Sequence, residues 1–323
     1  MTGASRVGAV LSLTGPLSRF GTQAADGLRV GMDLLGAPAP VLVDDAGEPG
    51  RVAPTLDVLA GSCDLLLGPY GTSTARAAAR WARESGRFVW NHGGAGDRVQ
   101  GAAPGRVVSV LTPTSGYAGA FVRYLAREHP GTPLRLVPGR GGFGRQVVAG
   151  AREAAARAGV TVVDEGPGAL FLAGSFDEDV DAVNRLPTGA DRPVVVGTVA
   201  AGVREFGRAA HDPDGVFGVA QWVPGAPGTP EVGPDEATFL DRYRAATGTG
   251  PDYPAVQAAA TAAIALHCAS VAGSTDPGAL WAAATALRTT TLYGAFAIDP
   301  VTGTQTGHGT TLVRWRDGRM SPV

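Results

Sequence analysis

Six residues, Gly139 to Gly144, have the spacing of a nucleotide-binding loop. They match the pattern G-x-G-x-x-G between a predicted strand and a predicted helix, and Asp164 ends the next predicted strand, twenty residues after Gly144. Such glycines let the backbone approach a pyrophosphate, while the acid holds a ribose hydroxyl. This pattern suggests an NAD(P)-dependent oxidoreductase. Pro138 removes a backbone donor at the loop entry, however, and a chain with 48 glycines produces the pattern easily by chance, so we favour a glycine-rich loop without a cofactor.

A second segment, Gly71 to Ala75, comes close to the G-x-S-x-G elbow of α/β hydrolases. Hydroxyl groups at a helix N-terminus more often cap the helix or bind an anion than attack a carbonyl group. We therefore expect Thr72 and Ser73 to bind a ligand rather than to catalyse a reaction. His92 follows a predicted strand and precedes Gly93-Gly94, where a ligand could reach it.

The remaining composition excludes several kinds of chemistry. All 27 basic residues are arginine, so a P-loop lysine and a pyridoxal phosphate Schiff base are impossible. The five histidines show no metal-ligand spacing, and Cys63 and Cys268 are expected to be free thiols. The adjacent Asp44 and Asp45 are expected to form a turn rather than a metal site. We expect neither a metal nor a cofactor.

The net charge of −2 argues against nucleic acid or an anionic membrane as the main partner, because either would favour a clustered basic face. No apolar run approaches 18 residues, so direct membrane insertion is not expected. The first predicted strand begins six residues after Met1, which leaves no room for a signal peptide. The chain is then either cytoplasmic as written or extracytoplasmic after removal of a leader.

These residues need a framework of strands and helices, and the sequence predicts one. Short apolar runs alternate with helical segments, which is typical of an α/β fold with doubly wound parallel sheets. The predicted strands are Val7 to Leu13, Pro40 to Asp44, Asp64 to Gly68, Arg87 to Asn91, Val107 to Thr112, Leu134 to Pro138, Val160 to Asp164, Ala169 to Ala173 and Pro193 to Thr198. The predicted helices are Thr22 to Leu35, Arg76 to Ser85, Gly116 to Glu128, Gly144 to Ala158, Glu236 to Ala246 and Pro254 to Ser270.

Two lobes are expected, since 323 residues exceed the size of a single hydrophobic core. The periodicity stops around Trp222 to Pro234, which indicates a linker or crossing segment, and the chain ends on antiparallel strands at Ala295 to Asp299 and Thr310 to Trp315.

The order of these segments resembles the type I periplasmic-binding-protein fold, in the branch of branched-chain-amino-acid-binding receptors of ABC transporters. The matching segments are Val7 to Pro16 with Gly21 and Gly27, Leu67-Gly68-Pro69 with Thr72 to Thr74, Phe143-Gly144, Pro251 to Ala255, and Tyr293-Gly294 to Asp299 with Gly303. The resemblance implies two α/β lobes joined by three crossings, with lobe one near residues 5–115 and 224–295 and lobe two near 116–223 and 296–323. It also implies closure on a small ligand in an interlobe cleft.

The resemblance further implies a set of ligand contacts. Thr72 and Ser73 match the hydroxyl loop for a ligand carboxylate, and Gly93 and Ala95 match the neighbouring contacts. Phe143 takes the place of a common tyrosine, and Ser175 or Phe176 falls near a second aromatic contact. Tyr117 and Trp222 are predicted in loops, where surface packing and ligand stacking remain equal alternatives.

One departure from the family concerns the ligand's ammonium group. Amino-acid-binding members carry an acid shortly after the strand that here ends at Thr198, whereas this chain has Val199-Ala200-Ala201. A buried ammonium without a partner is costly, so a free α-amino acid is not expected.

We therefore expect a non-catalytic, monomeric receptor for a small polar or carboxylate-bearing molecule, with an ABC-transporter permease as a further partner. The alternatives are a cytoplasmic ligand sensor on the same fold and the oxidoreductase that would use Gly139 to Gly144.

Overall fold

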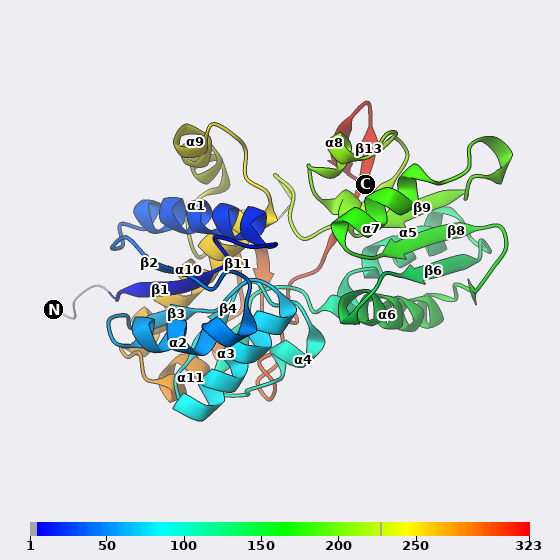
Figure 1. Cartoon of the computed structure of the whole chain (residues 1–323). Coiled ribbons are helices and arrows are strands. Elements are labelled where there is room, and N and C mark those ends of the chain that lie inside the picture. The colour runs from blue at the N-terminus through cyan, green and yellow to red at the C-terminus, as the bar shows by residue number, and fades with distance from the viewer. Residues whose placement is uncertain (1–4, 227) are drawn as a thin grey trace. The chain divides into compact units, whose positions relative to one another are not determined.

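The computed structural model describes residues 5–226 and 228–323, and the chain divides into two compact units (Figure 1). Unit 1 comprises Met1–Pro113 and Pro224–His308, and unit 2 comprises Thr114–Val223 and Gly309–Val323. The chain passes between them three times. Residues 296–308, assigned to lobe two from the sequence, fall in unit 1. There the Gln305 side-chain amide donates to the Val110 carbonyl at 3.0 Å, and the Gln305 backbone N–H donates to the Gln100 side-chain oxygen at 3.0 Å.

Unit 1 is built on a parallel sheet of five strands in the order β2-β1-β3-β4-β5. The strands are β1 (Val7–Leu11), β2 (Val41–Asp44), β3 (Leu65–Leu67), β4 (Val89–Asn91) and β5 (Val107–Ser109), and a separate hairpin pairs β11 (Thr289–Thr291) with β12 (Gly294–Phe296). Every residue of β1, β3, β4 and β5 is buried, as expected of a sheet that is covered on both faces.

Helices cover both faces of the unit 1 sheet. They are α1 (Ser18–Leu34), α2 (Pro49–Ala60), α3 (Thr72–Ser85), α4 (Asp97–Gln100), α9 (Glu236–Thr247), α10 (Tyr253–Ala272) and α11 (Pro277–Ala286). One apolar cluster joins α1, α10 and α11 to one face, and a second joins α2 and α3 to the other. Helix α10 is long and apolar enough to cross a membrane by composition, yet most of it is buried inside unit 1, as is usual for a core helix.

Unit 2 contains a mixed sheet of seven strands in the order β14-β13-β10-β9-β8-β6-β7. The strands are β6 (Leu134–Pro138), β7 (Val162–Val163), β8 (Ala169–Ala173), β9 (Val195–Thr198), β10 (Phe217–Ala220), β13 (Thr311–Arg316) and β14 (Arg319–Pro322). The first five in chain order are parallel, and β13 and β14 are antiparallel to their neighbours. The predicted strand Thr310 to Trp315 is therefore antiparallel to its neighbours, whereas the predicted strand Ala295 to Asp299 overlaps β12, which pairs with β11 in unit 1 and not with β13.

The helices of unit 2 follow the same doubly wound rule. They are α5 (Gly119–Glu128), α6 (Gly142–Ala158), α7 (Phe176–Asn184) and α8 (Phe206–Ala209), with short 3₁₀ turns η1 (Thr114–Gly116), η2 (Gly189–Asp191) and η3 (Ala200–Gly202). Helix α7 and the α8 segment pack with Trp315 on one face of the sheet. The predicted α/β fold with doubly wound sheets is therefore confirmed, although four predicted strands shorten to the two or three residues of β3, β4, β5 and β7.

Sequence patterns missed helices that carry unusual residues. Helix α2 begins with Pro49-Gly50 and contains Pro54, which disguise its periodicity. Helix α7 starts at Phe176, which with Ser175 was expected near an aromatic ligand contact, and its first turn is acidic. Helix α1 begins four residues before the predicted Thr22, because Gly21 fits directly against the backbone of Ser12, where a β-carbon would lie 2.0 Å from the Ser12 carbonyl oxygen.

Candidate functional site

The predicted polar contacts of unit 1 come together where β3 and β4 end. A parallel bridge joins Tyr70 to Gly93, and the Gly71 N–H donates to the Gly93 carbonyl at 3.0 Å. Thr72 lies against the next turn, since a β-carbon on Gly96 would lie 2.6 Å from the Thr72 methyl carbon. Thr72, Ser73, Gly93 and Ala95 therefore share one edge of the sheet, at the carboxyl ends of parallel strands, which is the usual position of a ligand in open α/β sheets.

The N-terminus of α3 opens at this edge without a side-chain cap. Its N-cap residue is Gly71 at φ +97°, a conformation that favours glycine, and no side chain accepts from the first turn. The Thr74 hydroxyl turns away and donates to the Tyr70 carbonyl at 2.5 Å. The first N–H groups of a helix have no acceptor within the helix and carry partial positive charge. Together with the half-buried Thr72 and exposed Ser73, they are suited to bind a carboxylate.

Asn91, at the end of β4, holds the facing loop in place. Its amide nitrogen donates to the Gly94 carbonyl at 2.8 Å and to the Ser109 hydroxyl at 2.7 Å. Its amide oxygen accepts from the N–H groups of Gly94 at 2.8 Å and Gly93 at 3.3 Å. Asn91 is 2% exposed. It is therefore a positioning residue that sequence inspection did not single out.

An aromatic cluster at the same edge was also missed. The ring of Phe20 stacks on that of Tyr70 with centroids 4.7 Å apart, and the hydroxyls of Tyr70 and Tyr253 form a short hydrogen bond. The guanidinium of Arg19 lies 4.4 Å from the Phe20 ring centroid. Burial raises the pKa of the Tyr253 hydroxyl to about 12, so it stays protonated. The sequence offered one signal for this cluster: Phe20, Tyr70 and Tyr253 each lie within two residues of the start of a helix, α1, α3 and α10 respectively.

His92 lies in the interior rather than at the surface of this edge. Its side chain is fully buried, which corrects the expectation that a ligand could reach it, and neither ring nitrogen has a hydrogen-bond partner among the described residues. Burial lowers the pKa of His92 to about 4, so the ring is neutral near pH 7.

In unit 2, the structure brings two of the predicted aromatic contacts together. Tyr117, which follows η1, meets Phe143 of α6 edge-on with ring centroids 5.7 Å apart. Trp222 follows β10 and is 4% exposed, and its indole N–H is buried without a partner among the described residues. Tyr117 is 7% exposed, so it is buried like Trp222, and neither is a surface residue.

Ser175 and Phe176 start α7. The Ser175 hydroxyl accepts from the Glu178 N–H at 3.3 Å, and Glu178 accepts from the Ser175 N–H at 2.9 Å, which is a capping box. The half-buried Phe176 packs against the apolar cluster under α7 and α8. Both residues therefore have structural roles that would be present without any ligand.

The glycine loop of unit 2 already has a carboxylate bound to it. Glu178 accepts from the Arg140 N–H at 3.2 Å and from the Arg140 side chain at 2.8 Å. Hydrogen bonds from the Ser175 N–H and from Arg140 hold the pKa of Glu178 at about 2. Asp164, the candidate ribose ligand, is exposed and lies 3.7 Å from Arg152.

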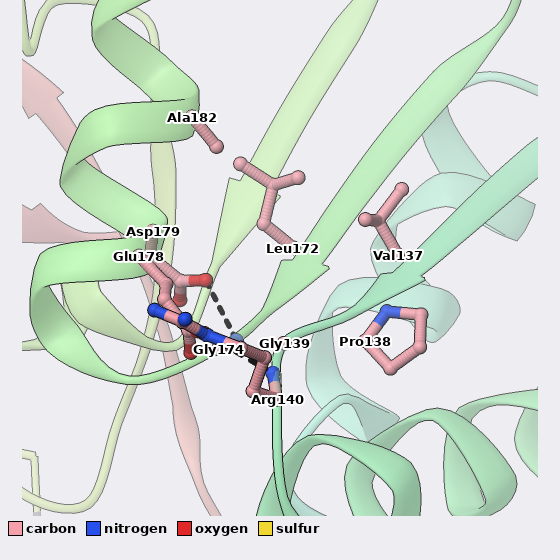
Figure 2. A pocket seen from close by; sticks show the side chains of 9 residues that line it. All are labelled: Val137, Pro138, Gly139, Arg140, Leu172, Gly174, Glu178, Asp179 and Ala182. Carbon is pink, nitrogen blue, oxygen red and sulfur yellow. Dashed lines mark hydrogen bonds and ion pairs between the residues drawn. The ribbon is translucent and has the colours of Figure 1, made fainter.

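A cavity of about 220 Å³ lies beside this loop (Figure 2). Figure 2 shows Arg140 beside Glu178 at one end of it, and Val137, Leu172 and Ala182 at the other. Because Glu178 neutralises Arg140, the rim offers no net positive charge for an anion.

Val199 is half-buried and follows β9, but a carboxylate does lie near this strand end. Asp179 of α7 accepts from the Gly174 N–H at 2.7 Å, from the Ala200 N–H at 3.3 Å and from the Thr198 hydroxyl. Burial raises its pKa, and only 2% of Asp179 is exposed. Its acceptors are thus used inside the fold and are not available to a ligand's ammonium group.

The described residues contain no group of three or more His, Cys, Asp or Glu side chains that could hold a metal ion. The adjacent acids form the predicted turn instead. Asp44 accepts from the N–H groups of Leu13 and Ala46, each at 2.8 Å, and Asp45 accepts from the Ser12 hydroxyl at 2.8 Å. Cys63 and Cys268 are both free and buried.

Solved structures with the same fold come from bacterial transport receptors. A leucine-binding protein from Thermotoga maritima has a TM-score of 0.80 at 14% identity, with 99% of this chain and 97% of that chain covered. A solute-binding protein from Rhodopseudomonas palustris in complex with benzoate has a TM-score of 0.78 at 17% identity, with 99% and 96% covered. A branched-chain amino acid transporter substrate-binding protein from Streptococcus pneumoniae, in complex with isoleucine, has a TM-score of 0.77 at 16% identity, with 98% of each chain covered.

No match was found among curated proteins. The sequence model described as periplasmic binding protein matches residues 5–170, which is more than half of the chain. The matched residues cover the five-stranded sheet of unit 1 together with β6 and β7 of unit 2. The chain belongs to the periplasmic binding protein family.

Proposed function

We propose that the protein is a non-catalytic receptor that binds a small carboxylate or neutral polar molecule with an apolar or aromatic body, and delivers it to an ABC-transporter permease outside the cytoplasm. The observation that carries this proposal is the uncapped N-terminus of α3, where Thr72, Ser73 and the loop from Gly93 to Ala95 share one edge. A helix N-terminus with adjacent hydroxyls favours an anionic group.

The side chains around this edge of the sheet favour a ligand that has a carboxylate and no amino group. Phe20, Tyr70 and Tyr253 add aromatic surface beside the α3 N-terminus, and Arg19 adds a positive charge over the Phe20 ring. None of these side chains carries the negative charge that would pair with an ammonium group. In unit 2, Tyr117, Phe143 and Trp222 are the proposed contacts for the apolar body, and the buried indole N–H of Trp222 is a donor that a ligand could use. Val199 supplies no charge.

A thermal-shift screen tests the ligand class. A ligand present at 100 times its dissociation constant should stabilise the folded state by about 2.7 kcal/mol. We expect benzoate or another simple carboxylate to raise the melting temperature more than leucine or isoleucine does. Replacing Ser73→Ala should reduce the shift, whereas Ser85→Ala, an exposed serine at the other end of α3, should leave it unchanged. If leucine gives the largest shift and Val199→Glu does not enlarge it, the inference from the missing acid is wrong.

The oxidoreductase alternative predicts a different result. A pyrophosphate at Gly139 to Gly144 would meet the Glu178 carboxylate, which already accepts the Arg140 N–H. We therefore expect no saturable change in NADH or NADPH fluorescence on titration. Saturable binding at micromolar cofactor that is lost in Gly141→Val would favour the oxidoreductase. A cytoplasmic sensor on the same fold would bind the same ligand without a permease, and cell fractionation separates that alternative from the proposed receptor.

A further inference from the structure

One helix face of unit 1 carries positive charge that the fold does not neutralise. Arg76, Arg80 and Arg83 are exposed on α3, at positions i, i+4 and i+7. With 100° and 1.5 Å per residue, these side chains start within about 60° of one another around the helix and about 10 Å along it. We call these three residues the arginine row. The segment from Thr72 to Arg106 holds six arginines and only two acids, Glu84 and Asp97, in a chain whose net charge is −2.

The arginine row gathers three arginines without partners on one helix face. No guanidinium of the row forms a hydrogen bond or an ion pair within residues 5–226 and 228–323. Some exposed arginines on other helices have carboxylates: Arg29 lies 3.1 Å from Asp26, Arg157 3.8 Å from Glu153, and Arg244 3.3 Å from Asp241. Others, such as Arg123 of α5 and Arg145 of α6, form no ion pair among the described residues, but each is the single arginine of this kind on its helix. Like charges at i, i+3 and i+4 destabilise a helix. An unbalanced row therefore has a cost that an anionic partner would remove.

We propose that the arginine row binds the surface of a membrane that contains anionic phospholipids. Guanidinium groups form paired hydrogen bonds with phosphate oxygens, which suits lipid headgroups. A protein partner would be expected to meet aromatic or apolar anchors. The exposed positions of α3 carry only Arg, Ser and Glu, and its one aromatic residue, Trp81, is buried and donates to Asp57. Recognition of charge without shape is the property of an anionic lipid surface.

The net charge of −2 argues against an anionic membrane as the main partner, and the arginine row is a local group of three arginines on α3 within that total. The row does not include Thr72 or Ser73, the proposed ligand contacts on the same helix.

The test is cosedimentation of the full chain with lipid vesicles. We expect binding to vesicles that mix phosphatidylcholine with phosphatidylglycerol, and none to pure phosphatidylcholine. Each arginine near an anionic surface contributes about a fivefold factor to partitioning, so Arg76→Gln/Arg80→Gln/Arg83→Gln should weaken binding roughly 100-fold. Binding should also fall on raising salt to about 0.15 M, where the Debye length is about 8 Å.

The matched control is Arg29→Gln/Arg157→Gln/Arg244→Gln, which removes the same charge from paired sites. It should retain vesicle binding within about twofold, and both triple variants should keep the wild-type circular dichroism spectrum and the wild-type thermal shift with benzoate. The proposal is overturned if phosphatidylglycerol vesicles do not bind, if both variants lose binding equally, or if polyglutamate binds through the row while the vesicles do not. The last result would assign the row to an acidic protein.

Discussion

Asn91 should be among the most sensitive polar positions of unit 1. Its side chain forms four hydrogen bonds, at 2.7, 2.8, 2.8 and 3.3 Å, and is 2% exposed. Asn91→Leu keeps a similar volume but leaves the Gly94 N–H and carbonyl and the Ser109 hydroxyl without their partner. Each hydrogen bond contributes about 0.5–1.5 kcal/mol, and the bond at 3.3 Å contributes least. We expect Asn91→Leu to lower the free energy of unfolding by about 3 kcal/mol.

Urea unfolding followed by circular dichroism measures this loss. Ser109→Ala, which removes only one of the four bonds, should cost about 1 kcal/mol. In the double variant, Ser109→Ala should cost clearly less, because Asn91→Leu has already removed its partner. A loss below about 1 kcal/mol for Asn91→Leu, or strictly additive effects of the two substitutions, would refute the role that we assign to this network. Weaker ligand binding in Asn91→Leu would link the network to the loop that faces Thr72.

Three further predictions concern stability. His92 has a folded-state pKa of about 4 against 6.5 for the free side chain, so the unfolded chain binds more protons between pH 4 and 6.5. The free energy of unfolding should therefore fall by about 3 kcal/mol as the pH drops from 6.5 to 4. In urea titrations at several pH values, His92→Phe should reduce that fall. Gly27→Ala should lower the free energy of unfolding by about 1–3 kcal/mol, because its β-carbon would lie 2.1 Å from the Ala255 carbonyl oxygen where α1 crosses α10. The control Gly278→Ala in α11 meets nothing within 4 Å and should be neutral or stabilising. Equal effects of the two substitutions would contradict this account of the crossing. Ser175→Ala should cost about 1 kcal/mol in thermal unfolding through loss of the α7 cap, and an unchanged midpoint would mean that the capping box contributes nothing.

Local patterns predicted most of the framework. The runs at Leu134 to Pro138 and Ala169 to Ala173 match β6 and β8 residue for residue. Every residue of β8 is buried, as its continuous apolar sequence predicts, whereas β6 exposes Val137 and Pro138. Apolar periodicity did not predict helix α2, because its prolines disguise the pattern. Family resemblance, rather than periodicity, pointed to Thr72 and Gly93 as ligand contacts. The bridge from Tyr70 to Gly93, just beyond the ends of β3 and β4, explains why segments some twenty positions apart meet.

The sequence by itself determined the fold class, the absence of lysine chemistry and the absence of an acid at Val199, since each depends on residue types and their local order. Only the tertiary structure decided which polar groups are already used. Asp179 and Glu178 are carboxylates near predicted contacts, yet both are bound within unit 2, and His92 is buried although it borders a glycine pair. Hydrogen-bond partners and burial come from segments distant in the chain, so a single sequence does not reveal whether a polar side chain faces a ligand or the protein's own backbone.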